Sequence, residues 1–369
     1  MKIAQVPPLY ESVPPKLYGG TERIVAYLSD ALVELGHDVT LFSSADAATK
    51  ARLVPVRDQA LRLDPAHRSS DVAAHFSMMH ELRARADEFD VIHFHIDLLH
   101  FPFFEDIADR TLTTLHGRLD IKDLAGAYER WSAYPLASIS NSHRKPLAGA
   151  NWLGTVHHGL PVDLHTPPSR PAGDYLAFLG RISPEKGPDR AIAIATKAGI
   201  PLRIAAKVDG ADRAYFREVV EPLLDNPLVE FIGEIDDGRK AEFLGNAIAL
   251  LFPIDWPEPF GLVMIEAMAC GTPVIAFPCG SVPEVIDEGV TGVVVDTIDE
   301  AADAVGRIGR LDRRRIRRVF EERFSAQVMA RKYLALYRRA ALRPQERRPA
   351  AASPARLGAV PEIAARPEG

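Results

Sequence analysis

Short apolar runs alternate with helical stretches along this 369-residue chain, and the alternation starts twice. The runs of the first series are KIAQV, DVTLFSS, VIHFH, TLTTLHG, LASISNS and TVHHG, and those of the second are DYLAFLGR, PLRIAAK, LVEFIG, AIALLFP and TPVIAF. Strands that alternate with helices pair in parallel through right-handed crossovers. The sequence therefore predicts an α/β protein with two Rossmann-like, doubly wound parallel-sheet domains.

A Pro-rich segment without periodicity, LPVDLHTPPSRPAG, separates the two series and is predicted to be the linker. We place an N-terminal domain at residues 1–162, the linker at 163–173 and a C-terminal domain at 174–322. The pattern over residues 299–343 is helical throughout. Residues 344–369 are rich in Pro, Ala and Arg and are predicted to be a disordered tail, because they have little apolar surface to bury.

Charge and apolar run lengths limit the kinds of partner. The formal net charge is −6, and Lys and Arg are interleaved with acids, so no nucleic-acid-binding face is predicted. The longest apolar run, AIALLFPI, is far shorter than the roughly 20 residues of a membrane span, and we expect a cytoplasmic protein. The Arg-rich segment RLDRRRIRRVFEERF is expected to be a solvated helix face, so that membrane contact is at most peripheral. Cys270 and Cys279 are predicted to be ordinary thiols.

The loop after the first predicted strand, PPLYESVPPKLYGGTER, is stiff and ends in two glycines. Ligands of open α/β sheets bind beyond the carboxyl ends of the strands, where helix N-termini offer unpaired N–H groups. Gly19 and Gly20 are therefore candidates for binding a phosphate group through backbone N–H, and either a glycine or Thr21 is expected to cap the next helix. A turn that merely needs positive φ is the alternative interpretation. No G-x-G-x-x-G follows the strand, which disfavours a nicotinamide or flavin enzyme.

Two segments of the second series carry candidate binding groups. FLGRISPEKGPDRAI places Arg181 and Lys186 at the end of a strand, where two cations can neutralise a leaving diphosphate. PEPFGLVMIEAMACGTPV is predicted to form a helix from about Phe260, with Glu258 before it and Glu266 about 12 Å further along the helix axis. This separation exceeds the roughly 5 to 9.5 Å between the carboxyl groups of a glycosidase. It suits a ligand that lies along the start of the helix.

The motifs GGTER, TLHG, GRISPEKG and EPFGLVMIEAMACGTPVIA, in this order and at these separations, closely resemble those of the retaining family-4 glycosyltransferases of GT-B fold. The resemblance covers about residues 1–340. It implies two Rossmann-like domains facing across a cleft, and a helix over residues 323–343 that returns to the N-terminal domain. The segment QVPPLYESVPPKLYGG near the start of this chain is similar to that of a bacterial subset of the family often labelled UDP-glucose-dependent.

The resemblance also implies roles for individual residues. His116, Glu258, Arg181 and Lys186 would form the catalytic set: His116 beside the reacting sugar, Glu258 on its hydroxyls, and the two cations on the diphosphate. The donor would further be bound by the residues of the glycine loop, by the N–H groups at the start of the helix and by a ribose-binding glutamate, which are Gly19, Gly20, Gly261, Leu262, Val263, Met264 and Glu266. The usual Pro-Asn-Gly-Val-Asp is replaced here by HHGLPVD, so no role is transferred to His157 and His158.

The implied reaction is transfer of a hexose, with glucose favoured, from a nucleotide diphosphate sugar to a hydroxyl acceptor with retention of configuration. The acceptor, whether a small molecule, a glycan or a lipid-linked compound, stays open. No bound cofactor or metal is expected, and the HFHID run is interpreted as an ordinary strand end rather than a metal site. A GT-B epimerase or phosphorylase, or a non-catalytic sugar-nucleotide-binding protein, are the alternatives.

Overall fold

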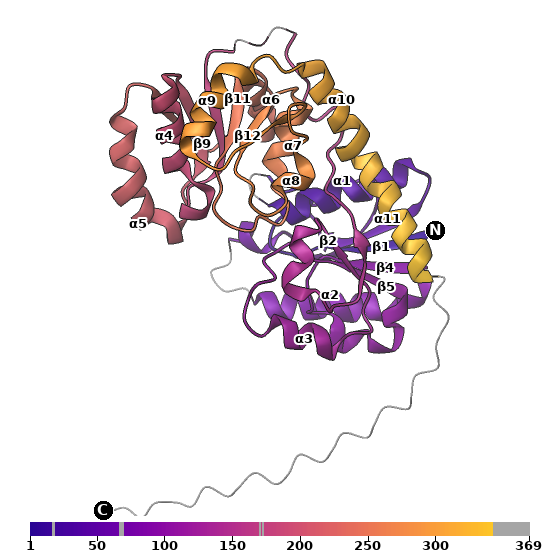
Figure 1. The fold of residues 1–369 in the computed structure, drawn as a ribbon. Helices are drawn as coiled ribbons and strands as arrows, with labels where there is room; N and C mark the ends of the chain where they lie inside the picture. Colours follow the sequence, from indigo (N-terminus) through magenta and orange to yellow (C-terminus); the bar gives the residue numbers. More distant parts are fainter. Residues whose placement is uncertain (17–18, 66–69, 170, 172, 342–369) are drawn as a thin grey trace, which may run out of the picture.

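The computed structural model describes residues 1–16, 19–65, 70–169, 171 and 173–341, and it contains two parallel sheets (Figure 1). The first sheet has seven strands in the order β3-β2-β1-β4-β5-β6-β7. Its elements are β1 (Lys2–Val6), α1 (Gly20–Glu34), β2 (Asp38–Ser44), β3 (Arg52–Arg57), α2 (Asp71–Ala84), β4 (Val91–Phe94), β5 (Thr111–Thr114), α3 (Leu124–Arg130), β6 (Leu136–Ser138) and β7 (Trp152–Thr155). Every residue of β4 and β5 is buried, as expected for central strands covered on both faces.

The second sheet has six strands in the order β10-β9-β8-β11-β12-β13. Its elements are β8 (Leu176–Arg181), α4 (Pro188–Ala198), β9 (Leu202–Lys207), α5 (Arg213–Tyr215), β10 (Val229–Gly233), α6 (Asp237–Gly245), β11 (Ala249–Phe252), α7 (Leu262–Ala269), β12 (Val274–Ala276), α8 (Val282–Val285), β13 (Gly292–Val294) and α9 (Ile298–Ile308). The prediction of two doubly wound parallel sheets is confirmed. The short edge strands β3 and β13 were not predicted, and the helix predicted around residues 211–224 is broken into α5 and short 3₁₀ and π segments.

The strand order of each sheet reverses once, and these two switch points determine where a ligand can bind. In the first sheet the reversal lies between β1 and β4, and in the second it lies between β8 and β11. The crevice beyond the carboxyl ends of the strands at such a point is the usual ligand site of open α/β sheets. The loop that ends in Gly19 and Gly20 follows β1, Arg181 is the last residue of β8 with Lys186 just after it, and Glu258 follows β11.

The chain returns to the first domain through two helices, α10 (Arg313–Phe324) and α11 (Ala326–Ala341), which Figure 1 shows in yellow crossing from the upper to the lower domain. The segment 299–343, which was predicted to be helical, is divided among α9, α10 and α11. Asp312 caps α10 by accepting a hydrogen bond from the backbone N–H of Arg314, and Ser325 is extended and bridges to Leu160. The change of direction at Ser325 therefore lies beside the outgoing chain, and α11 packs on α1, β4, β5 and β7.

One hydrophobic core extends through both domains because α10 and α11 carry apolar side chains into each. It includes Val25 of α1, Leu153 of β7, Phe320 of α10, Tyr337 of α11 and Ile265 of α7. Within the described residues, no helix is long and apolar enough to cross a membrane. The predicted tail, residues 344–369, lies outside the described part of the chain.

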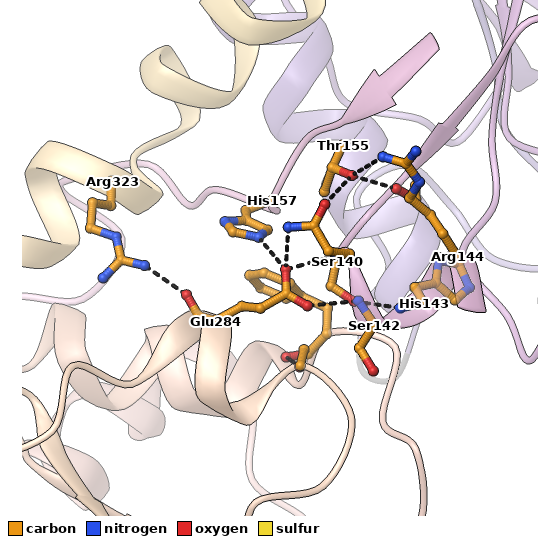
Figure 2. Close-up of polar contacts among 12 residues, drawn as sticks. Ser140, Ser142, His143, Arg144, Thr155, His157, Glu284 and Arg323 are labelled. Atoms are coloured by element: carbon orange, nitrogen blue, oxygen red, sulfur yellow. Dashed lines mark hydrogen bonds and ion pairs between the residues drawn. The ribbon is translucent and has the colours of Figure 1, made fainter. Parts of the chain in front are cut away.

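A second connection between the domains is polar and centres on Glu284 of α8 (Figure 2). Its carboxylate accepts hydrogen bonds from the backbone N–H groups of Asn141 and Ser142, each at 2.7 Å, and from Nδ2 of Asn141 at 3.0 Å. Nε2 of His157 lies 3.3 Å from the same carboxylate. Burial raises the pKa of Glu284, but the hydrogen bonds from His157, Asn141 and Ser142 outweigh burial and lower the pKa from 4.5 to about 2.

We predict that Glu284 makes the stability of the protein depend on acid pH. A carboxyl whose pKa is depressed by folding stabilises the fold above its unfolded pKa, and this stabilisation is lost as the pH falls towards its folded pKa. A shift from 4.5 to about 2 corresponds to about 3 kcal/mol, lost between about pH 5 and pH 2. In denaturant titrations, Glu284→Gln should be less stable than wild type at pH 7, and the two should converge at low pH. The control Glu322→Gln, at an exposed position of α10, should not change the pH dependence.

Candidate active site between the two domains

A cavity of about 860 Å³ lies between the carboxyl edges of the two sheets. It is lined by residues of both domains, and ten of the eleven predicted site residues are among them: Gly19, Gly20, His116, Arg181, Lys186, Glu258, Gly261, Leu262, Val263 and Glu266. Met264 is the exception. Its side chain is fully buried, and its backbone N–H donates to the carbonyl oxygen of Gly261 at 3.1 Å. The structure thus brings together the predicted residues except Met264.

The N-terminus of α1, which follows Gly19, lies against the C-terminal domain. Gly19 has a φ of 156° and is the N-cap of α1, which has no side-chain cap, so Thr21 does not take that role. A Cβ on Gly19 would lie 2.9 Å from Cβ of Pro15, whereas one on Gly20 would lie 3.7 Å from Cδ1 of Leu262. The first residue of α1 therefore sits against the first residue of α7, across the boundary between the domains.

The two predicted cations each face carboxylates. The Arg181 guanidinium donates to Glu185 at 2.6 Å, and it lies 3.4 Å from Asp212 and 3.9 Å from Asp209. The Lys186 ammonium forms an ion pair with Glu258 and stands over the ring of Trp256, 4.8 Å from its centroid. Both cations are thus held in place by partners on the C-terminal domain and border the cavity.

Glu258 lies in the loop before α7, in agreement with its predicted position ahead of the helix. The prediction that the helix starts near Phe260 is corrected, because Gly261 adopts a left-handed conformation with φ 76° and α7 begins at Leu262. Nε1 of Trp256 donates to the carboxylate of Glu258 at 3.1 Å, in addition to the ion pair with Lys186. Two partners therefore orient this carboxylate at the cavity wall.

Glu266 belongs to a charged cluster that joins the domains. It is 5% exposed and accepts a hydrogen bond from Lys240 at 2.8 Å, and Lys240 also lies 3.0 Å from Asp237. Asp237 forms an ion pair with Arg23 of α1, on the other side of the cleft. Burial raises the pKa of Glu266, but the charge of Lys240 and the neighbouring His165 outweigh burial and lower it. Arg23 and Lys240 were missed because charged residues on helices give no distinctive signal in a sequence.

The histidine of the TLHG motif lies at the end of β5 with other imidazoles around it. His116 is half-buried, its Nε2 lies 2.9 Å from Nδ1 of His95, and its ring stacks on that of His158 at 5.3 Å between centroids. Burial lowers the pKa of His116 to about 3, with a further contribution from His143. His116 is therefore neutral near pH 7, and it can donate or accept hydrogen bonds but cannot supply a positive charge.

Asp97 of the N-terminal domain also lines the cavity. From the sequence, its carboxyl was considered only as a possible metal ligand. Asp97 lies just beyond β4 in a left-handed conformation with φ 50°, which is uncommon for a residue other than glycine. Burial raises its pKa to about 6. His93 instead hydrogen bonds to Tyr337 and Thr114, and no group of three potential ligands among the described residues could hold a metal ion. Asp97 thus offers a hydrogen-bonding group on the side of the cavity opposite Glu258.

Both halves of the chain match known protein families. Residues 18–146 match the family described as Glycosyltransferase Family 4, and residues 167–321 match the family described as Glycosyl transferases group 1. D-inositol 3-phosphate glycosyltransferase of Mycolicibacterium smegmatis is 32% identical over 189 residues, which cover 45% of this chain and 40% of that protein. The chain thus spans about 40% of the length of the curated relatives that it matches.

Solved structures match over nearly the whole chain. AviGT4, a glycosyltransferase involved in avilamycin A biosynthesis, has a TM-score of 0.71 at 24% identity, covering 92% of this chain and 98% of that one. Anabaena Alr3699/HepE, in complex with UDP and glucose, has a TM-score of 0.69 at 18% identity, covering 91% and 98%. At these identities the likeness shows the fold.

The arrangement of two parallel sheets around a shared cavity is that of the GT-B glycosyltransferases. In that fold, residues 18–146 are similar to the Glycosyltransferase Family 4 domain and residues 167–321 to the Glycosyl transferases group 1 domain.

We predict that His116 does not take up a proton between pH 8 and pH 5. Its pKa of about 3 lies below this range because its imidazole is removed from water. The ring C–H signals of His116, assigned by comparison with His116→Asn, should keep constant chemical shifts in an NMR pH titration. A midpoint near 6.5 would contradict the buried, neutral imidazole.

Proposed function

We propose that this protein is a retaining glycosyltransferase that moves a hexose, with glucose favoured, from a nucleotide diphosphate sugar to a hydroxyl acceptor. The observation that carries the proposal is the shared cavity, where two cations, two carboxylates and two helix N-termini meet across the domain boundary. These are the groups that the diphosphate, the sugar hydroxyls and the ribose of such a donor require.

In this proposal the donor lies mainly against the C-terminal domain. Arg181, Lys186 and the N-termini of α1 and α7 stabilise the negative charge that develops on the leaving diphosphate. Glu258 accepts hydrogen bonds from sugar hydroxyls, and Glu266 accepts them from the ribose. These groups are already oriented by their partners, so little reorganisation opposes the reaction.

The acceptor lies against the N-terminal wall, where Asp97, His116 and Tyr10 border the cavity. An oxygen of the departing phosphate assists removal of the proton from the acceptor hydroxyl on the same face of the sugar, which retains its configuration. The chain itself supplies the positive charge, so the reaction proceeds without a bound metal.

The names of similar proteins support the donor class. The Anabaena structure contains UDP and glucose, and the mycobacterial relatives are named as glycosyltransferases of D-inositol 3-phosphate. Because these relatives are matched over less than half their length, their acceptor gives a starting compound for an assay rather than an assignment.

The direct test is incubation of the protein with UDP-glucose, GDP-mannose and UDP-N-acetylglucosamine, each with a panel of hydroxyl acceptors and with EDTA. The product should form with UDP-glucose, keep the anomeric configuration of the donor by NMR, and form equally with chelator. Conversion of the donor without an acceptor would indicate an epimerase, and dependence on inorganic phosphate would indicate a phosphorylase. Donor binding without turnover across the whole panel would favour a binding protein.

We predict that Lys186→Ala and Arg181→Ala each lower kcat by roughly 10² to 10³, the scale for removing one preorganised charge that stabilises a transition state. The matched control is Lys197→Ala, which removes an exposed lysine of α4 that pairs with Asp299 away from the cavity. The control should keep the wild-type rate. Steady-state rates of the two site variants within about threefold of wild type would refute their role.

We predict that Glu266→Gln weakens binding of UDP alone by about 1 to 3 kcal/mol, or roughly 5- to 150-fold in Kd, because it removes a charged acceptor for the ribose. Lys240 keeps Asp237 as a partner in this variant, which limits the structural damage. Glu258→Gln should leave UDP affinity nearly unchanged and impair transfer, and Glu230→Gln, at an exposed pair with Arg203, should change neither. Calorimetric titration with UDP measures the affinity of all three variants. An unchanged affinity of Glu266→Gln would show that the ribose binds elsewhere.

A further inference from the structure

An exposed apolar surface lies on the N-terminal domain beside the cavity. It is formed by Val72 and Phe76 of α2 and by Leu99 and Phe103, which follow β4, and we call it the apolar surface. The exposed fractions of these residues are 55%, 45%, 39% and 39%. Val72 and Phe76 are one turn apart and share one face of α2. The rings of Phe76 and Phe103 are in edge contact, with 5.1 Å between centroids, and this contact joins α2 to the segment after β4.

The apolar surface continues into the cavity. Leu99 belongs to both, since it is exposed and lines the cavity. His75, which precedes Phe76 on α2, lines the cavity as well, and its ring lies 5.3 Å from that of Tyr10, another residue of the cavity wall. A ligand that is held in the cavity by the N-terminal domain can therefore extend onto the apolar surface and stay in contact with the protein.

The N-terminal wall of the cavity, which is the part lined by the N-terminal domain, differs in character from the C-terminal wall. Among the described residues that line the N-terminal wall, the cations are Arg23, which is 5% exposed and pairs with Asp237, and Arg62, which pairs with Glu11. The C-terminal wall has four cations, which are Arg181, Lys186, Lys207 and Lys240. The N-terminal wall instead presents many apolar side chains, including Pro8, Ile96, Leu98, Leu99 and Leu124. This wall therefore offers mainly apolar contact area.

Size and charge argue against a protein or a membrane as the occupant of the apolar surface. Side chains at these exposed fractions present a few hundred Å², against roughly 800 Å² per partner in a stable protein interface. The segments that carry the surface, 71–84 and 97–106, contain five acids and one arginine, Arg83, which pairs with Asp106. An anionic lipid surface attracts clustered cations rather than acids. The surface therefore fits a small apolar group.

We infer that the acceptor carries an apolar group, an aryl or alkyl substituent, in addition to its reacting hydroxyl, and that this group lies on the apolar surface. The inference rests on the proposed function, in which the acceptor lies against the N-terminal wall. Asp97 lines the cavity two residues before Leu99, so its carboxyl can hold a hydroxyl of the acceptor while the apolar group reaches Leu99 and Phe76. Covering the surface removes apolar area from water, and a fully polar acceptor lacks this contribution to binding.

The test compares two acceptors that differ only in their apolar group, phenyl β-glucoside and methyl β-glucoside. Each is titrated calorimetrically into the protein with UDP present. The phenyl compound should bind at least about tenfold more tightly, because its ring covers apolar side chains. Phe76→Gln and Leu99→Gln, on separate segments, should each reduce this preference at least about threefold and leave the affinity for UDP unchanged. The control Leu223→Gln, 37% exposed on the second domain and outside the cavity, should keep the preference.

Equal affinities of the two glucosides, or no binding of either, would overturn the inference. Binding to phosphatidylcholine or phosphatidylglycerol vesicles, or a concentration-dependent dimer, would also overturn it if Phe76→Gln abolished that association, because the surface would then have another occupant.

The titration requires no turnover, so the inference and the proposed function can fail separately. If the phenyl compound binds more tightly and Phe76→Gln abolishes this preference, but no donor is turned over, the proposed function fails and the surface stands as a binding site for an apolar group. Transfer to both glucosides with equal kcat/KM would retain the proposed function and overturn the inference.

Discussion

The docking of α11 on the first sheet is the contact on which the rest of the molecule depends. Tyr333 and Tyr337 are fully buried there, and their hydroxyls bond to Thr114 at 3.0 Å and to Gln5 at 3.1 Å. Because the chain enters the second domain after β7 and comes back at Ser325, this helix fixes how the two sheets face each other. The cavity exists only because their carboxyl edges are held in opposition.

Polar contacts then connect the domains on two sides of this hydrophobic junction. Arg23 and Asp237 pair beside the cavity, and Glu284 holds the segment at Asn141 away from it. Both contacts are largely removed from solvent, since the side chain of Arg23 is 6% exposed and that of Glu284 is 19% exposed. The structure therefore combines a hydrophobic junction at α11 with polar contacts on two sides of it.

The cations that border the cavity are paired with carboxylates, and this pairing affects how the cavity can bind a diphosphate. Lys186 pairs with Glu258, Lys240 with Glu266, and Arg181 with three carboxylates of its own domain. The cations are thus oriented by neighbours, and a ligand with both anionic and hydroxyl groups can engage cations and carboxylates together. A simple anion satisfies only the cations.

The sequence by itself determined the fold class and most of the residues around the cavity. Alternating strands and helices indicate parallel sheets, which place the residues at or just after the ends of β1, β5, β8 and β11 at the carboxyl edges. Gly20, His116, Arg181 and Glu258 could therefore be located from local pattern and resemblance. Only the tertiary structure decided that Met264 turns away and that the helical segment 299–343 changes direction at Ser325. It also decided that Gln5, Arg23 and Tyr337 lie around the site. The physical reason is distance along the chain. A glutamine in a strand or a tyrosine in a helix has no distinctive local pattern. Gln5 and Tyr337 are 332 residues apart, and packing alone brings them together.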